Sequence, residues 1–141
     1  MQALDQVIIV CISVVLVGVV ALAIVILTRK SVPQLDVERY RLKWLAIEKQ
    51  LTTDDASASQ MVVVNADKLL DQALKDCGVS GETMGERMKA AANRWSNANN
   101  VWKAHKLRNQ IAHEPDVKVT RNDARRALAG FKQALKDLGA I

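Results

Sequence analysis

MVVVNADKLLDQALKDCG, residues 61–78, is the stretch that decides between a helical and a strand-containing fold. Its three consecutive valines, Val62 to Val64, favour a strand locally because β-branched side chains suit extended backbone. The apolar residues that follow recur at the 3.6-residue period of an amphipathic helix, and Gly78 is typical of a helix end. The longer pattern outweighs the local one, so the stretch predicts a helix that starts behind a capping aspartate, Asp54 or Asp55.

Two further helices are predicted on either side of this stretch. Apolar residues at helical spacing place the first helix of the domain at about 34–51, with charged residues on its other face. Downstream, Thr83-Met84-Gly85-Glu86 fits the capping box, in which the threonine hydroxyl and the glutamate carboxylate each bond a free backbone amide. A shorter helix is therefore expected from there to about Trp95.

The last two helices are also bounded by capping and terminating residues. An asparagine-rich break precedes a helix predicted at 101–113, which should end there because Pro115 biases the residue before it away from helical angles. Thr120 caps the final helix, and Gly139 closes it. With no convincing strand and no internal repeat, the fold class predicted for residues 37–141 is all-α, a bundle of about five helices.

Residues 7–27, VIIVCISVVLVGVVALAIVIL, are the most apolar part of the chain and contain no charged residue. At ~1.5 Å rise per residue, such a segment covers a hydrocarbon core of ~30 Å. Arg29 and Lys30 follow the segment and no basic residue precedes it, which predicts an N-terminus outside and a cytoplasmic C-terminal domain. A cleaved signal peptide would begin with a basic segment, and no Lys or Arg precedes the apolar residues here. Residues 1–30 therefore predict a retained single-pass anchor in the cell membrane, followed by a tether at 31–36.

The composition excludes several kinds of site. Cys11 lies in the predicted span and Cys77 is alone in the domain, so neither a disulfide nor a cysteine metal site is expected. Two histidines without carboxylates at ligand spacing predict no metal, and no cofactor signature is present. The net charge of +5 suits an anionic partner or a membrane surface, but many helical domains carry a similar excess.

Arg108 takes an unusual position in the predicted helix 101–113. At ~100° per residue it falls inside the apolar stripe, between Leu107 and Ala112, where a solvated arginine is not expected. Because an unpaired buried charge costs several kcal/mol, the guanidinium must find an acceptor or reach a wet cleft. The carboxylates of the bundle that could pair with this guanidinium are Asp67, Asp71, Glu86 and Glu114.

Asn109 and His113 lie on the flank of the same stripe. They are four residues apart, so the Asn109 amide is expected to hold the His113 imidazole in one orientation. The five-residue offset places Arg108 about 140° from His113 around the helix. The two side chains can converge only if the terminal turn opens or if a second chain supplies one of them.

Arg108-Asn109-Gln110-Ile111-Ala112-His113 resembles the R-x4-H motif, with a polar residue after the arginine, of the HEPN domains. These are all-helical bundles found in ribonucleases, toxins and defence systems, and the resemblance covers about 35–139. Active members cut RNA without a metal, usually as dimers whose motifs meet in a shared cleft. The resemblance therefore implies a homodimer that binds RNA or a nucleotide. It gives Arg108 the role of phosphate clamp, His113 that of acid or base, and Asn109 that of orienting residue.

His105, Trp102 and Lys106 are further candidates for contact with a substrate. His105 shares a face with Arg108, although a histidine in a bundle is more often satisfied internally, and a tryptophan is more often part of the core. Two other functions stay open. The domain could be a non-catalytic protein-interaction or self-association module at the membrane, in which Arg108 is a structural ion-pair member, or a partner subunit of a toxin system.

Overall fold

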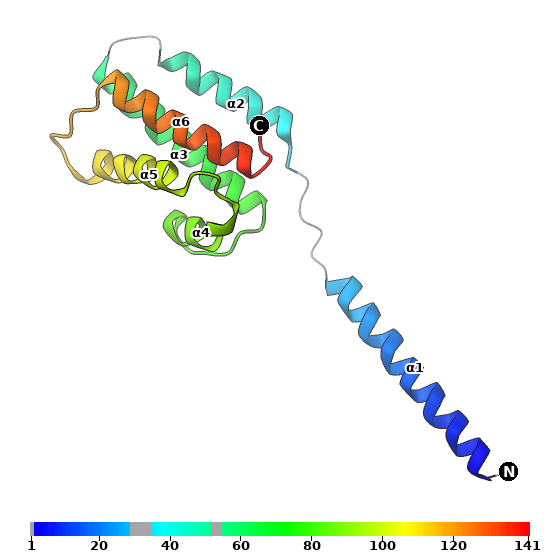
Figure 1. Ribbon diagram of the computed structural model, residues 1–141. Coiled ribbons are helices and arrows are strands. Elements are labelled where there is room, and N and C mark those ends of the chain that lie inside the picture. Colours follow the sequence, from blue (N-terminus) through cyan, green and yellow to red (C-terminus); the bar gives the residue numbers. More distant parts are fainter. Residues whose placement is uncertain (1, 29–34, 52–54) are drawn as a thin grey trace. The chain divides into compact units, whose positions relative to one another are not determined.

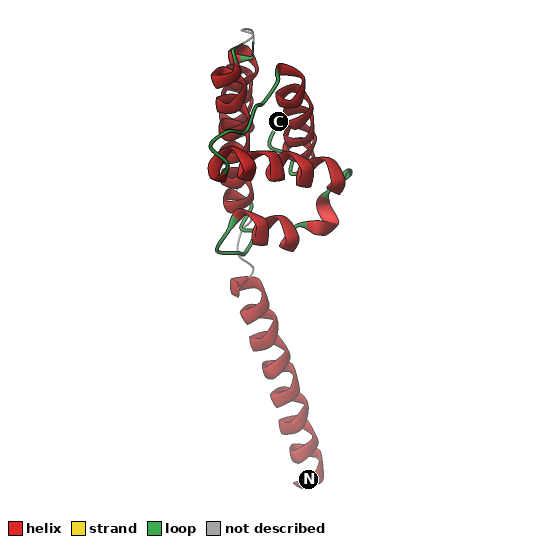
Figure 2. Cartoon of the chain, turned by 90° about the vertical axis from the view of Figure 1, so that its left-hand side faces the viewer, coloured by secondary structure: helices red, strands yellow, loops and turns green. Residues whose placement is uncertain are grey.

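The computed structural model describes residues 2–28, 35–51 and 55–141 of the chain. The chain divides into two compact units, Met1–Val32 and Pro33–Ile141. Every regular element in the described ranges is a helix, which confirms the all-α fold class (Figure 2).

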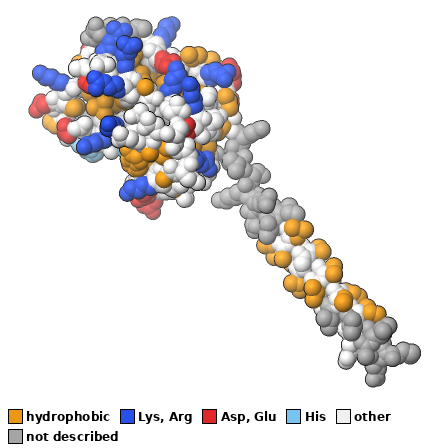
Figure 3. All heavy atoms as spheres, in the orientation of Figure 1, with side chains coloured by type: hydrophobic (Ala, Val, Ile, Leu, Met, Phe, Trp, Pro, Cys, Tyr) orange, Lys and Arg blue, Asp and Glu red, His pale blue; other side chains and the backbone are white. Residues whose placement is uncertain are grey.

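The first unit contains one helix, α1 (Gln2–Thr28). Figure 3 shows apolar side chains along its described part, and those of Val17 and Leu22 are 69% and 60% exposed. The predicted span, 7–27, falls within α1, and its side chains at 7, 9, 10 and 25–27 lie outside the described residues, as does most of the predicted tether. Within the part of the chain that is described, no helix combines the length and apolarity needed to cross a membrane.

The second unit is a helical bundle with α3 at its centre. Its α-helices are α2 (Val37–Gln50), α3 (Ala56–Asp76), α4 (Met84–Ala90), α5 (Ala98–His113) and α6 (Arg121–Asp137), with a short 3-10 helix, η1 (Ala92–Arg94), after α4. α3 packs against α2, α4, α5 and α6, and α6 also packs against α5 (Figure 1). The five α-helices confirm the predicted size of the bundle.

α3 holds its central place because nine of its side chains are buried against the neighbouring helices. Val62 and Val63 are completely buried, so the valine run that locally favours a strand forms part of the helical core. The carboxylate of Asp55 accepts hydrogen bonds from the backbone amides of the second and third residues after it, which confirms one of the two predicted caps. Gly78 ends the helix with φ at +70°, a conformation that suits glycine.

The predicted third helix is too long, because α4 ends at Ala90 rather than near Trp95. The chain tightens into η1 and places the Trp95 side chain back over α4. There the indole N–H of Trp95, which is 9% exposed, donates to the carbonyl oxygen of Met88 at 3.0 Å. Burial of a large aromatic side chain with its one donor satisfied outweighs continuation of the helix.

The predicted starts of two helices are wrong by three residues, and in both the cap is the cause. α2 begins at Val37 rather than 34, because the Asp36 carboxylate accepts from a backbone amide of the first turn. α5 begins at Ala98 rather than 101, because Asn97, the first asparagine of the polar break, is the cap. The later asparagines are therefore part of the first turn of α5.

α5 and α6 approach each other closely, and this approach positions α5 over α3. A Cβ atom at Gly130 of α6 would lie 2.7 Å from the carbonyl oxygen of Asn100, so only glycine fits at this crossing. α5 ends at His113, as predicted, and Thr120 starts α6 with a capping box. The register of α5 against the bundle is thus fixed at both of its ends.

Candidate functional site

An open cleft of about 960 Å³ is bounded by α3, α4 and α5. Four of the predicted site residues line it, namely Arg108, Asn109, His105 and Trp102. Lys106 and His113 are exposed and do not line this cleft. The rest of the wall comes from α3, α4 and the turn before α4.

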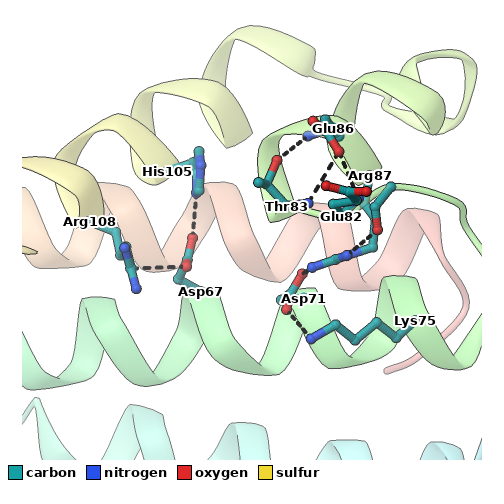
Figure 4. A network of polar contacts seen from close by, with 10 residues as sticks. Asp67, Asp71, Lys75, Glu82, Thr83, Glu86, Arg87, His105 and Arg108 are labelled. Carbon is teal, nitrogen blue, oxygen red and sulfur yellow. Dashed lines mark hydrogen bonds and ion pairs between the residues drawn. The ribbon is translucent and has the colours of Figure 1, made fainter.

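Arg108 meets a carboxylate of its own bundle, as its place on the apolar stripe requires. Its Nε atom lies 3.3 Å from Oδ2 of Asp67 on α3, and the Asp67 side chain is only 6% exposed (Figure 4). The N–H bond is not aimed at that oxygen, so Nε is buried without a hydrogen bond. The Arg108 side chain itself is 31% exposed. The guanidinium is thus paired with Asp67 on one side and exposed to the cleft on the other.

Asp67 also binds His105, and the contacts close into a ring. Nδ1 of His105 lies 2.8 Å from Oδ1 of Asp67, and Nε2 lies 3.3 Å from the amide nitrogen of Asn109. Nη1 of Arg108 donates to the amide oxygen of Asn109 at 3.2 Å. Asp67, His105, Asn109 and Arg108 form what we call the polar ring. Trp102 stands edge-on to the His105 ring, with 6.1 Å between centroids.

The predicted pairing of Asn109 with His113 is wrong, because Asn109 pairs with His105. Both histidines are four residues from Asn109, so helical spacing allows either partner. His105 is 9% exposed and anchored by Asp67, whereas His113 is exposed at the end of α5. Among the described residues, none forms a hydrogen bond or an ion pair with the His113 side chain.

A second ion pair lies one turn further along α3 and was not predicted. Arg87 of α4 donates from Nε and Nη2 to Oδ1 of Asp71, at 2.8 and 2.6 Å, and from Nη1 to the carbonyl oxygen of Gly81 at 2.6 Å (Figure 4). Lys75 pairs with Oδ2 of Asp71 at 2.7 Å. We call Asp71, Arg87 and Lys75 the Asp71 cluster. Burial acts to raise the pKa of Asp71, but the hydrogen bonds from Lys75 and Arg87 outweigh it and lower that pKa.

The sequence carried a signal for Arg87 of the same kind as for Arg108. Arg87 lies three residues after Met84 and next to Met88, and all three side chains are buried on one face of α4. An arginine on an apolar stripe needs an acceptor, so the rule that singled out Arg108 would also have found Arg87.

Three backbone amides at the start of α4 are bonded by side chains of the same turn. The Glu86 carboxylate accepts from the backbone amides of Glu82 and Thr83, at 2.7 and 3.3 Å, and the Thr83 hydroxyl accepts from the amide of Glu86 at 3.2 Å. These backbone hydrogen bonds lower the pKa of Glu86. The predicted capping box is thus confirmed.

The charges around the cleft nearly balance. Its wall carries five Lys or Arg side chains and four Asp or Glu side chains, and these are Lys68, Lys75, Arg87, Lys89 and Arg108 against Asp67, Asp71, Glu82 and Glu86. Such a wall suits a ligand with one anionic group better than an extended polyanion. Over the ranges that are described, no group of His, Cys, Asp and Glu is arranged to hold a metal ion.

Fold and site together define a helical-bundle protein with a charged cleft. The central helix of the bundle supplies one buried and one half-buried aspartate, and each is paired with an arginine of a neighbouring helix. No protein-family model, curated protein or solved structure matches the chain.

Proposed function

We propose that the chain is a membrane-tethered, HEPN-like helical domain that binds RNA or a nucleotide in the cleft between α3, α4 and α5. The observation that carries the proposal is the convergence of Arg108, His105, Asn109 and Trp102 on this one cleft. These residue types suit a phosphate and its attached nucleoside.

Arg108 is the natural phosphate ligand of the cleft. A guanidinium is always charged and presents forked donors that match phosphate oxygens. About a third of its side chain is exposed, and Asp67 holds its Nε side while its outer edge faces the cleft. Trp102, half-buried at the same wall, offers an aromatic edge or face to a base.

Metal-independent RNA cleavage is the specific activity to test first. The motif resemblance gives Arg108 the stabilisation of charge on the phosphate and His113 the transfer of a proton. His113 is exposed at the end of α5, so it is accessible to a second copy of the chain. In this proposal the active form is a homodimer, and a strictly monomeric chain would contradict it.

The membrane tether is the second part of the proposal and draws on the sequence. Residues 7–27 are free of charged side chains, and the side chains described in α1 from 11 to 24 are all exposed. An apolar helix of 27 residues that buries none of these side chains in its own unit suits a lipid environment. Alkaline extraction of membranes tests the tether, because a bilayer-spanning chain stays in the pellet. Protease treatment of sealed vesicles tests the predicted cytoplasmic side of the domain.

The binding proposal is tested with the full-length chain in detergent, a short fluorescent single-stranded RNA and adenosine monophosphate. Loss of a charged hydrogen bond costs about 1.5–3 kcal/mol, so Arg108→Gln should weaken binding about tenfold or more. Lys136→Gln removes an exposed charge on α6, away from the cleft, and should leave binding unchanged. Failure of the wild-type chain to bind either probe would overturn the proposal.

Cleavage is tested separately, with EDTA present, by comparing wild type with Arg108→Ala and His113→Ala. Both variants should lose cleavage while keeping their helical circular dichroism. Equal cleavage by all three chains would point to a contaminating nuclease. No cleavage by a wild-type chain that binds RNA would leave a binding domain without this activity.

The ion pair between Arg108 and Asp67 favours one alternative, a non-catalytic interaction or self-association module. In that case Arg108 is needed for the fold rather than for a ligand. Arg108→Gln would then lower the stability of the domain strongly, and wild type would bind neither RNA nor nucleotide.

A further inference from the structure

We infer that Arg108 and His105 bind one phosphate group between them, in the place that the Asn109 amide takes in the structure, and that this binding takes up one proton. The inference rests on the proposed function and names two ligand contacts of that same cleft. It assigns a phosphate contact to His105 and leaves the proton transfer of the proposed cleavage with His113.

The Asn109 amide bridges the side chains of Arg108 and His105. Its oxygen accepts from Nη1 of Arg108 at 3.2 Å, and its nitrogen lies 3.3 Å from Nε2 of His105. Both distances are at the long end of the usual range for hydrogen bonds, so these contacts are weak. A phosphate oxygen is a stronger, charged acceptor, and it can replace the neutral amide between Nη1 and Nε2.

Asp67 holds the two side chains from the opposite side. It lies 2.8 Å from Nδ1 of His105 and 3.3 Å from Nε of Arg108, and it is only 4% exposed. Asp67 touches neither Nη1 nor Nε2, so these two donor positions stay directed at the amide. We therefore assign Asp67 as a positioning residue.

The protonation of His105 follows from its partners. Because Nδ1–H donates to Asp67, Nε2 of the neutral ring is an acceptor, and the NH₂ group of Asn109 satisfies it. A phosphodiester has only acceptor oxygens, so it can occupy this position only if Nε2 carries a proton. That proton comes from solvent and is held on Nε2 in the complex. Binding of a diester to the neutral ring therefore takes up one proton.

No other charged group of the cleft bonds to the His105 ring. α4 faces Nε2 with Gly85, where a Cβ atom would be 4.0 Å away. The Asp71 cluster is paired within itself, and Glu86 is bonded to backbone amides. The remaining charged side chains of the wall are Lys68, Glu82 and Lys89. Histidine is the side-chain type that changes charge between about pH 5 and 8, and His105 is the histidine that lines this cleft.

The test is calorimetric titration of the full-length chain in detergent with a 2′-O-methyl RNA dinucleotide. Its single phosphate is a diester that carries no titrating proton, and the methyl group prevents cleavage through the 2′-oxygen. Titration at about pH 7.5 in buffers with different ionisation enthalpies measures the protons taken up, because histidine is then largely neutral. We expect an uptake close to one proton for wild type, and affinity that rises as the pH is lowered toward about 6.

Three variants decide the assignment. His105→Gln should abolish the proton uptake and weaken binding about tenfold, whereas Lys136→Gln, at an exposed residue of α6 outside the cleft, should change neither. Asn109→Ala removes the bridging amide but keeps both donors, so affinity should stay the same or rise, with proton uptake retained. Tryptophan fluorescence checks that each variant is folded, since all three tryptophans lie in the helical bundle.

The outcomes separate this inference from the proposed function. Binding of the dinucleotide without proton uptake would overturn the inference and leave the binding cleft in place. The same holds if His105→Gln keeps the proton uptake, or if Asn109→Ala abolishes binding in a folded chain. A wild-type chain that binds neither the dinucleotide nor longer RNA would overturn the proposed function itself.

Discussion

Asp67 and Asp71 lie one helical turn apart on α3, and each meets an arginine from a neighbouring helix. Arg87 is 7% exposed, and three of its nitrogen atoms donate hydrogen bonds within the protein. Arg108 is 31% exposed, and its Nε is buried without a hydrogen bond. The Arg87–Asp71 pair is thus buried and bonded within the protein, whereas the Arg108–Asp67 pair leaves part of its arginine exposed.

This difference separates a structural ion pair from one that can serve a ligand. A buried arginine whose three nitrogen atoms all donate within the protein has little left to offer a ligand, and its removal leaves a carboxylate partly uncompensated. An arginine held on one side and exposed on the other keeps its orientation while its outer donors remain available. The polar ring and the Asp71 cluster should therefore respond differently to the same kind of mutation.

The largest effect is expected for Arg87→Ala. Removing one partner of a buried ion pair typically costs about 3–5 kcal/mol, because the other charge stays buried without compensation. Lys75 still pairs with Asp71, so the cost should fall toward the lower end of that range. Urea unfolding followed by tryptophan fluorescence measures the loss. A loss below about 1 kcal/mol would show that the Asp71 cluster behaves as an exposed ion pair.

Gly130→Ala should have the next largest effect, and it should act on the polar ring rather than on the Asp71 cluster. The added Cβ would lie 2.7 Å from the carbonyl oxygen of Asn100, so α5 must shift away from α6. Overpacking of this kind costs about 1–3 kcal/mol. Because α5 carries His105 and Arg108, RNA binding should weaken as well. Ala129→Ser, next to it and exposed on α6, serves as the control. Unchanged stability of Gly130→Ala would contradict the close crossing.

Much of the fold could be predicted from the sequence because its signals are local. Helical periodicity and caps such as Asp55 and Thr120 lie within a few residues of the elements they define. The starts of α2 and α5 are also set by local caps, Asp36 and Asn97, among several polar residues that could take that place, whereas the end of α4 depends on the packing of Trp95 back onto that helix.

The candidate site could be predicted only in part. The place of Arg108 on an apolar stripe indicated that it needs an acceptor, but four carboxylates were available, and Asp67 is 41 residues away in the sequence. Spacing could not choose between the two histidines that flank Asn109, because both are four residues from it. Tertiary packing makes that choice, since only His105 lies against Asp67.

Asp71→Asn should have a smaller effect that depends on pH. The pKa of Asp71 is lowered in the folded chain, since the hydrogen bonds from Lys75 and Arg87 outweigh the effect of burial. The ionised carboxylate therefore stabilises the fold fully above its ordinary pKa of 3.8, and this contribution is lost as the pH falls through the lowered value. Urea midpoints for Asp71→Asn should accordingly change less with pH below about 4 than those of wild type. Asp116→Asn, at an exposed aspartate, should keep the wild-type dependence.

The smallest effect on stability is expected for Arg108→Gln, and it bears most directly on the contrast between the two arginines. Arg108 is partly exposed, and the contact of 2.8 Å between His105 and Asp67 remains after its removal. Because Asp67 keeps that contact, the cost should be about 1 kcal/mol. A urea midpoint close to that of wild type, together with a large loss of RNA binding, would assign the polar ring to a ligand. A loss of stability as large as that of Arg87→Ala would make both arginines structural and favour the non-catalytic module.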